Sequence, residues 1–514
     1  MGRTVRPRQQ AAGRPAAANR ADQGSLHGPG RMRGAVAGAR GPSGRNGGEQ
    51  RTDDPQFAID CRGQRMSPSK PMILPAYVLL CLLLGGSSQA IWGNAALRLL
   101  AVAILGWSLL TREPQPIAPA GRRLLWVVAA AGLLVLAQLL PLPPAVWTAL
   151  PGRAFAVDGY RLLGMPLPWL PASLSPADTL ASALTLLPPL AVLVGMMRLR
   201  CWSSGWMVLA IIVGAAISIV LGMLQVSSGG QGTWYFYQRT NLGVAVGTFA
   251  NGNHFATLLL ATMPLLAALA AAKWRSASSQ QDRSLIVALG LGATALLGFG
   301  VLINRSSAML MLGPPVAAAA ALLLFRLSRQ RLFQGGAAIG LVLAVAAAGV
   351  VVARDVPAWG IGASIDTRTQ FWSRSLTAAK DHALAGSGFG TFQKVYRQYE
   401  DPAAVDRWYV NHAHNDYLEL AVEGGVPAIL LTLVFLWWWA GRGRELWLSP
   451  TALEQKGALI ASAAILLHSA LDYPLRTAAI SVVFAFCLAM LAGARGASRP
   501  SAFDEQDQAR HATL

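Results

Sequence analysis

Residues 206–226 read WMVLAIIVGAAISIVLGMLQV, an apolar run that contains no charged side chain. A run of about 17–25 such residues is long enough to cross the hydrocarbon core of a bilayer as an α-helix. The apolar side chains do not alternate with polar ones, as the strands of a membrane barrel would require. The run therefore predicts a transmembrane helix.

Similar runs fill most of the chain on both sides of this one. The composition agrees, because 54% of the residues are hydrophobic and only 13% are charged, whereas soluble domains carry about 25% charged residues. We therefore expect an all-α polytopic membrane protein with about twelve transmembrane helices. The predicted spans are 72–91, 94–110, 124–140, 178–197, 206–226, 254–272, 284–303, 308–325, 336–352, 416–440, 457–473 and 478–492.

Positive charges are concentrated in every second connection between these spans. Short cytoplasmic connections of membrane proteins carry an excess of Lys and Arg. The pattern therefore predicts that both termini are cytoplasmic and that the long connection 354–415 lies on the extracytoplasmic side. The basic residues that set this orientation are Arg112, Arg122, Arg123, Arg198, Arg200, Lys273, Arg275, Arg283, Arg326, Arg329, Arg331, Arg442, Arg444 and Lys456.

The two ends of the chain differ in composition from its middle. Residues 1–71 are rich in Gly, Pro, Ala, Ser and Arg and have no apolar period, so they cannot bury a core. We expect a disordered basic leader, or a sequence that begins upstream of the true start codon, which would then be Met66 or Met72. Binding of this leader to nucleic acid or anionic lipid is the weaker alternative. Residues 72–495 are the expected membrane domain, and 496–514 a cytoplasmic tail. The segment 85–90, GGSSQA, is similar to a signal-peptide cleavage site, although we expect the first helix to be retained.

The connection 354–415 is far longer than ordinary loops, and such loops are usually functional or disordered. Its aromatic content favours a folded lid on the membrane surface. At its end stands NHAHNDYL, residues 411–418, and on a helix His414 would share a face with Leu418, Ala421 and Gly425. A functional histidine and a histidine that merely caps the helix remain alternatives. The aromatic residues are Phe371, Trp372, Phe389, Phe392, Tyr396, Tyr399, Trp408 and Tyr409.

The stretch 368–425 resembles the O-antigen ligase and Wzy-type polymerase superfamily of bacterial membrane glycosyltransferases. The family motifs R-x3-W, a Gly-rich turn, and H-N-x-x-L with a later Gly correspond here to 368–372, HALAGSGFGTF at 382–392, and HNDYL at 414–418 with Gly425. GTFANGNH at 247–254 and HSALDYPL at 468–475 are also similar to family stretches. The family's SR turn is matched only partly, because Asn304 stands where the family has Ser.

This resemblance implies a GT-C-like fold in the bacterial inner membrane. It implies transfer of glycan from an undecaprenyl-diphosphate carrier to an acceptor on the periplasmic face, with O-antigen ligation to lipid A core preferred. A Wzy-type polysaccharide polymerase and a protein O-oligosaccharyltransferase are the alternatives within the family. Many metal-dependent GT-C enzymes have paired acidic residues in the first external loop, whereas residues 87–94 contain none. We therefore expect a metal-independent enzyme without a cofactor and without a nucleic-acid partner.

Side-chain chemistry suggests roles for the polar residues on the predicted external side. A guanidinium binds phosphate bidentately and stays protonated, which suits it to stabilise a departing lipid diphosphate. Arg368 and Arg305 are the candidates for this role, with Arg374 in reserve. His414 could act as general base on the acceptor hydroxyl or could position it. The further candidates for substrate binding are Asn415, His412, Asp472 and His468.

Two alternatives to these expectations remain. His468 and Asp472 are four residues apart, so they would share a helical face, and a structural ion pair of Asp472 with Arg476 or with an Arg of the lid is slightly preferred over a functional role. A polytopic transporter is the non-enzyme alternative for the whole chain. Transporters of that size usually show paired halves, and the sequence shows none.

Overall fold

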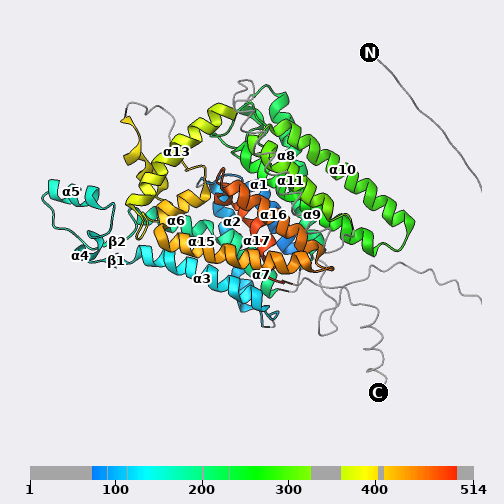
Figure 1. Ribbon diagram of the computed structural model, residues 1–514, viewed down its shortest axis with the longest axis horizontal. Helices are drawn as coiled ribbons and strands as arrows, with labels where there is room; N and C mark the ends of the chain where they lie inside the picture. Colours follow the sequence, from blue (N-terminus) through cyan, green and yellow to red (C-terminus); the bar gives the residue numbers. More distant parts are fainter. Residues whose placement is uncertain are drawn as a thin grey trace, which may run out of the picture. The chain divides into compact units, whose positions relative to one another are not determined.

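The computed structural model describes residues 72–89, 91–112, 114–199, 202–230, 232–325, 361–402 and 410–494, which belong to one compact unit. These residues are mostly helical, as expected, with almost no sheet (Figure 1). Several predicted features lie outside the described residues: the leader 1–71, the span 336–352, parts 354–360 and 403–409 of the lid, the tail 496–514, and Arg200, Arg326, Arg329 and Arg331.

Helices occupy each predicted span that the structure describes. Seven of the described helices, with α6 and α7 taken as one, are long and apolar enough to cross a membrane, while α1, α11 and α17 are apolar but shorter. The chain is thus a multi-pass membrane protein; the total of twelve spans and the GT-C-like arrangement remain predictions. The bounds are α1 Ile73–Leu84, α2 Trp92–Leu110, α3 Pro119–Leu139, α6 Pro176–Thr185, α7 Leu187–Arg198, α8 Ser204–Ser227, α9 Gly252–Ser276, α10 Gln280–Asn304, α11 Ser307–Leu322, α15 Asp416–Leu448, α16 Leu453–Ser469 and α17 Ala478–Leu491.

Three of the predicted boundaries are wrong. The first helix ends at Leu84, because the carbonyls of Gly85 and Gly86 accept hydrogen bonds from Ala479 and Ala250 on other segments. The fourth span is divided into α6 and α7 just before two prolines, whose missing N–H groups interrupt the helix. Helix α16 runs from Leu453 to Ser469, so the predicted span 457–473 has the right length but lies four residues too far along the chain.

The core of the bundle is built around α9, α16 and α17. Helix α9 packs against α16, α10 and α11, while α17 packs against α7, α16 and α1. Small residues let these helices approach one another: a Cβ on Gly457 of α16, for example, would lie only 2.5 Å from the Cβ of Ala268 on α9. Close backbone contact through small residues is the usual means of helix packing in membranes.

Short elements connect the long helices. The strands β1, Pro141–Leu142, and β2, Leu170–Pro171, form one antiparallel pair, with α4 and α5 between them. The described part of the lid contains α13, α14 and η4, and its apolar side chains form a small cluster. The remaining bounds are α4 Pro144–Trp147, α5 Ala154–Leu162, η2 Gly232–Trp234, α13 Ile361–Asp381, α14 Phe392–Tyr396, η4 Arg397–Tyr399 and η6 Pro474–Arg476. The cluster comprises Ala378, Phe392, Val395, Tyr396, Ala413 and Val422.

The Gly-rich segment 382–390 is bound into a kink of α15. Gly425 has φ 60° and ψ −157° inside this helix, and the N–H of Val426 donates to the carbonyl of Ala383 at 2.7 Å. A Cβ on Gly425 would lie 2.4 Å from that carbonyl oxygen, and a Cβ on Gly386 would lie 2.1 Å from the carbonyl oxygen of Glu423. The lid is therefore anchored to α15 through two backbones that touch.

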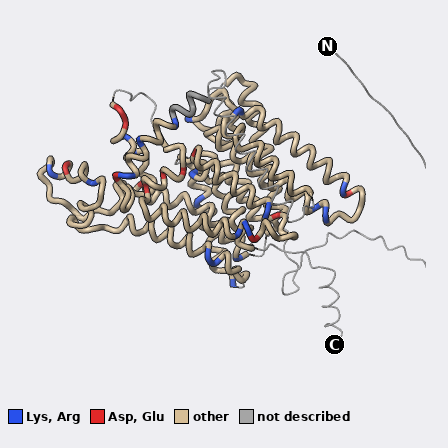
Figure 2. The backbone as a smooth tube through the Cα atoms, in the orientation of Figure 1, with Lys and Arg blue, Asp and Glu red and all other residues tan. Residues whose placement is uncertain are grey.

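Charged residues gather mainly at the ends of the long helices (Figure 2). At the predicted cytoplasmic ends, Arg198 donates from Nε to the carbonyl of Ser108 at 2.9 Å, and Arg442 donates to that of Leu491 at 3.0 Å. Such contacts give buried ends of helices the donors that their last carbonyls need. The cytoplasmic location of these ends stays a prediction.

Candidate functional site

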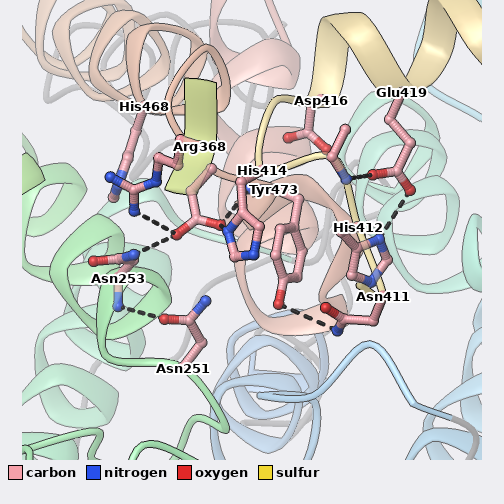
Figure 3. Close-up of polar contacts among 12 residues, drawn as sticks. Asn251, Asn253, Arg368, Asn411, His412, His414, Asp416, Glu419, His468 and Tyr473 are labelled. Carbon is pink, nitrogen blue, oxygen red and sulfur yellow. Dashed lines mark hydrogen bonds and ion pairs between the residues drawn. The ribbon is translucent and has the colours of Figure 1, made fainter. Parts of the chain in front are cut away.

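The candidate site lies where several helix ends meet (Figure 3). The beginning of α9 supplies Asn253, helix α13 supplies Arg368, the turn before α15 supplies His412 and His414, and the segment after α16 supplies Asp472 and Tyr473. The predicted residues Arg368, His414 and Asp472, which the sequence separates widely, are thus brought together.

Asp472 is the centre of the cluster, and it is fully buried. Its Oδ1 lies 3.1 Å from Nδ1 of His414, and its Oδ2 lies 3.9 Å from Nη2 of Arg368. The amide of Asn253 donates a short hydrogen bond to Oδ2. The sequence left open an ion pair with Arg476 or with an Arg of the lid, and the structure shows the second.

The charge state of Asp472 follows from these partners. Burial raises the pKa of this carboxyl group, but the neighbouring His414, together with His254 and Arg368, outweighs burial and holds the pKa well below its usual range. Asp472 is therefore a carboxylate at neutral pH. Helix α16 ends at Ser469, before Asp472, but the N–H of Asp472 still donates to the carbonyl of His468. Both side chains contact α9, Asp472 at Asn253 and His468 at Thr257, so they face the same neighbouring helix as expected.

His414 precedes α15 and does not belong to its helical face, which corrects the prediction from the sequence. Helix α15 begins at Asp416, with Asn415 as its N-cap, and His414 has φ 51°. A non-glycine residue in this left-handed region costs free energy, which its surroundings must offset. Phe371 stacks on the imidazole with ring centroids 5.9 Å apart, and Trp372 donates from Nε1 to the His414 carbonyl at 3.3 Å.

A second histidine lies on the other side of Tyr473. The rings of His412 and Tyr473 are 4.0 Å apart, and the ring of His414 lies 5.1 Å from Tyr473. Nδ1 of His412 lies 2.8 Å from Oε1 of Glu419, and its Nε2 lies 3.2 Å from Oγ of Ser88. Each imidazole therefore contacts a carboxylate through Nδ1, and Tyr473 separates the two pairs.

Arg476 joins three acidic residues of α15 beneath this pair. It lies 3.6 Å from Asp416, 3.4 Å from Glu419 and 2.9 Å from Glu423. Burial lowers the pKa of Arg476, but the three carboxylates more than reverse this effect and raise it. Removing the guanidinium would leave three buried acidic groups without their common counter-ion.

The other predicted residues lie around the site in less direct roles. Arg305 ends α10 with φ 54° and an exposed side chain, and it forms no ion pair with a carboxylate in the described ranges. Its neighbour Ser306 donates to Oδ1 of Asn253 at 2.8 Å. Arg374 lies beside Tyr396, whose pKa is raised by burial and lowered less strongly by that guanidinium.

Two further predicted residues are engaged in structural contacts. Oδ1 of Asn415 accepts hydrogen bonds from the N–H groups of Tyr417 and Leu418, and so caps α15. His468 is fully buried, and its Nδ1 lies 2.8 Å from Oγ1 of Thr257. These contacts use Oδ1 of Asn415 and Nδ1 of His468, and the part of either residue in substrate binding stays a prediction. Within the described parts of the chain, no three His, Cys, Asp or Glu side chains converge as metal ligands.

Sequence reasoning missed several residues of the site. Asn253 and Tyr473 lie within stretches whose likeness to the family was noted, but neither was assigned a role. Glu419 and Glu423 are four residues apart at the start of α15, so their common helical face could have been read from the spacing. Ser88 carried no signal, because its contact with His412 joins segments 324 residues apart.

The comparisons with known proteins place part of this site in a family. Residues 291–433 match the family model described as O-antigen ligase. The matched segment contains Arg305, Arg368 and His414, while Asp472 and Asn253 lie outside it. A search of curated proteins gave no match. For this segment, the match confirms the likeness to the O-antigen ligase/Wzy-type family that the motifs indicated.

Proposed function

The chain carries an O-antigen ligase domain over residues 291–433, and we propose that it transfers a glycan from undecaprenyl diphosphate to an acceptor on the periplasmic face. The preferred acceptor is lipid A core. The enzyme would act without a metal or cofactor in the bacterial inner membrane, with the described parts of the lid, 361–402 and 410–415, beside the site. The observation that supports this proposal best is the pairing of His414 with the ionised Asp472.

The pairing prepares His414 to take a proton. Asp472 accepts from Nδ1 of the imidazole at 3.1 Å, so Nε2 is left as the proton acceptor. When Nε2 removes the proton of the acceptor hydroxyl, the resulting imidazolium is stabilised by the carboxylate beside it. A positioned base of this kind contributes about 10²–10⁴-fold to a reaction rate.

Arg368 is placed to stabilise the other product of the reaction, the departing lipid diphosphate. Its guanidinium is only loosely paired with Asp472, at 3.9 Å, and its side chain is 16% exposed. It can therefore keep one edge on the carboxylate and present another to phosphate. Arg305 extends this positive charge from the end of α10, where its exposed guanidinium is free to reorient.

Complementation tests both the activity and the site. Wild type, His414→Ala, Arg368→Ala and the control Arg161→Ala would be expressed in hosts that lack either the ligase or the polymerase, and lipopolysaccharide would be separated on gels. Arg161 is an exposed residue of α5 whose side chain is 73% accessible. We expect capped lipid A core with wild type and the control in the ligase-deficient host, and none with the two site variants.

Other outcomes change the proposal in definite ways. A restored ladder in the polymerase-deficient host would identify a polymerase. No rescue in either host would favour a different acceptor, including protein, or the transporter alternative. Capping that survives both site substitutions would refute the roles given to His414 and Arg368.

A further inference from the structure

A cavity of about 510 Å³ lies between α9, α10 and α11, at the ends of these helices that are remote from the candidate site. Its walls are almost entirely apolar, and Leu266, Leu297 and Ala320 represent the three helices. All three belong to the apolar helices of the membrane domain. The cavity is therefore in contact with lipid and not with bulk water.

Two of the residues that α10 contributes to the cavity wall are glycines, which leave space there. Gly290 and Gly298 line the cavity, and a Cβ built on either residue would meet no heavy atom within 4 Å. The space is therefore not a packing defect between tightly fitted residues. A larger side chain in place of one of these glycines would occupy the space, and such a substitution can test whether the cavity binds a ligand.

The mouth of the cavity is basic and aromatic. Trp274 and Arg275 line it, and the guanidinium of Arg283 lies 5.8 Å from the centre of the Trp274 ring. Lys273 lies on the same last turn of α9. The acidic neighbour Asp282 accepts a hydrogen bond from the hydroxyl of Ser279. The three basic side chains named here outnumber this one carboxylate, so together these four residues carry a net positive charge.

We propose that this cavity binds one acyl chain of an anionic phospholipid, whose phosphate lies against Arg283. Arg275, which donates from Nη2 to the carbonyls of Leu323 and Phe325, adds positive charge beside it. Apolar walls suit the chain, and the cationic mouth selects the headgroup. Basic pockets between transmembrane helices bind anionic headgroups on the cytoplasmic side, and each Lys or Arg near the surface contributes about 1 kcal/mol. The positive charges of this connection place the mouth on that side.

The lipid carrier of the proposed reaction is a less suitable occupant. The mouth at Arg275 and the reacting end at Asn253 lie at opposite ends of α9. At about 1.5 Å per residue, about 33 Å of helix separates them. A carrier bound here would hold its diphosphate away from Asp472. A phospholipid would instead brace the helices that present Asn253 and Arg305.

The test is the thermal unfolding midpoint of the purified full-length protein in detergent, with phosphatidylglycerol, phosphatidylcholine or undecaprenyl phosphate added. Native mass spectrometry would count the bound lipids. Gly290→Leu places a side chain in the cavity and raises helix propensity, and its Cβ meets no heavy atom within 4 Å. Gly292→Leu is the matched control, because a Cβ on Gly292 also meets nothing within 4 Å, while this residue does not line the cavity.

We expect phosphatidylglycerol to raise the midpoint of wild type and Gly292→Leu more than phosphatidylcholine does, and Gly290→Leu to lose this effect. Arg283→Gln should need about fivefold more phosphatidylglycerol for half of the shift. Equal stabilisation of wild type by both phospholipids would overturn the headgroup assignment. Unchanged lipid binding by Gly290→Leu would overturn the site. If undecaprenyl phosphate binds more strongly than phosphatidylglycerol, and Gly290→Leu abolishes that binding, the occupant is the lipid carrier and not a phospholipid.

Discussion

Arg368 and His414 contact opposite oxygens of one carboxylate, that of Asp472. The group proposed for the diphosphate and the group proposed for the acceptor hydroxyl are therefore held by the same anion. Movement of either side chain changes the electrostatic environment of the other. This arrangement allows the proton gained by His414 and the charge developing on the diphosphate to be compensated within one cluster.

Loss of the histidine should remove the proton acceptor while leaving the fold intact. His414→Gln should lower the transfer rate about 10²–10⁴-fold, and Asp472→Asn should lower it less, because the imidazole remains but loses its counter-ion. The measurement is single-turnover transfer with purified protein and a lipid-diphosphate glycan. A rate for His414→Gln within about tenfold of wild type would contradict a general base.

Substitutions of Arg368 should separate the contribution of its positive charge from that of its planar donor geometry. Arg368→Gln should lower the rate about 10²–10³-fold, as expected for a lost group that stabilises developing charge. Arg368→Lys should retain part of the activity, because it keeps the charge but loses the planar pair of donors. Arg374→Gln serves as the comparison, since Arg374 lies beside Tyr396. A larger loss in Arg374→Gln would exchange the roles of the two arginines.

The acidic cluster around Arg476 should dominate stability on this side of the protein. Arg476→Gln leaves three buried carboxylates without their shared guanidinium, and breaking a buried pair in this way costs about 3–5 kcal/mol. Glu423→Gln should cost less, because Asp416 and Glu419 still neutralise the arginine. Denaturant unfolding in mild detergent measures both. Equal losses in the two variants would show that Arg476 is not the common partner on which the three acidic residues depend.

His382 should make the fold sensitive to acid. Burial first, and then the neighbouring Arg153 guanidinium, lower the pKa of His382 from its ordinary 6.5 to about 4, while Asp381 acts in the opposite direction. Between these values the unfolded chain binds a proton that the folded chain does not. Stability therefore falls as the pH is lowered through this window and changes little below it.

The check is the unfolding midpoint of wild type and His382→Gln at about pH 7 and about pH 5. Wild type should lose more stability on acidification than the variant, because glutamine does not titrate. Parallel losses would mean that other groups cause the acid sensitivity. Arg153 also donates to the Gly386 carbonyl at 3.0 Å. For this reason His382 is substituted and Arg153 is kept, so that this hydrogen bond is present in both proteins.

The helices could be predicted from the sequence because a transmembrane span is a local property. Apolar length alone located each span within the described residues. The breaks could not be placed in the same way. The end of α1 depends on hydrogen bonds from Ala250 and Ala479, and only the tertiary structure brings these residues to Gly85 and Gly86.

The site shows the same division. The family motifs pointed to Arg368 and His414, and spacing suggested that Asp472 pairs with an arginine. The turn at His414 was missed because a positive φ outside glycine has no reliable local signal. The role of Asn253 was missed because its partner Asp472 is 219 residues away. Contacts between distant helix ends follow from packing and not from sequence spacing.

The touching backbones of Gly386 and Gly425 also have a genetic consequence. Any base change in a glycine codon that alters the amino acid adds a side chain, and neither position has room for one. In a random mutant library, functional clones should therefore keep these two codons for glycine, while Gly290 and Gly292 drift. The contact between the lid and α15 would then appear in the gene as two positions, 386 and 425, at which no substitution is accepted.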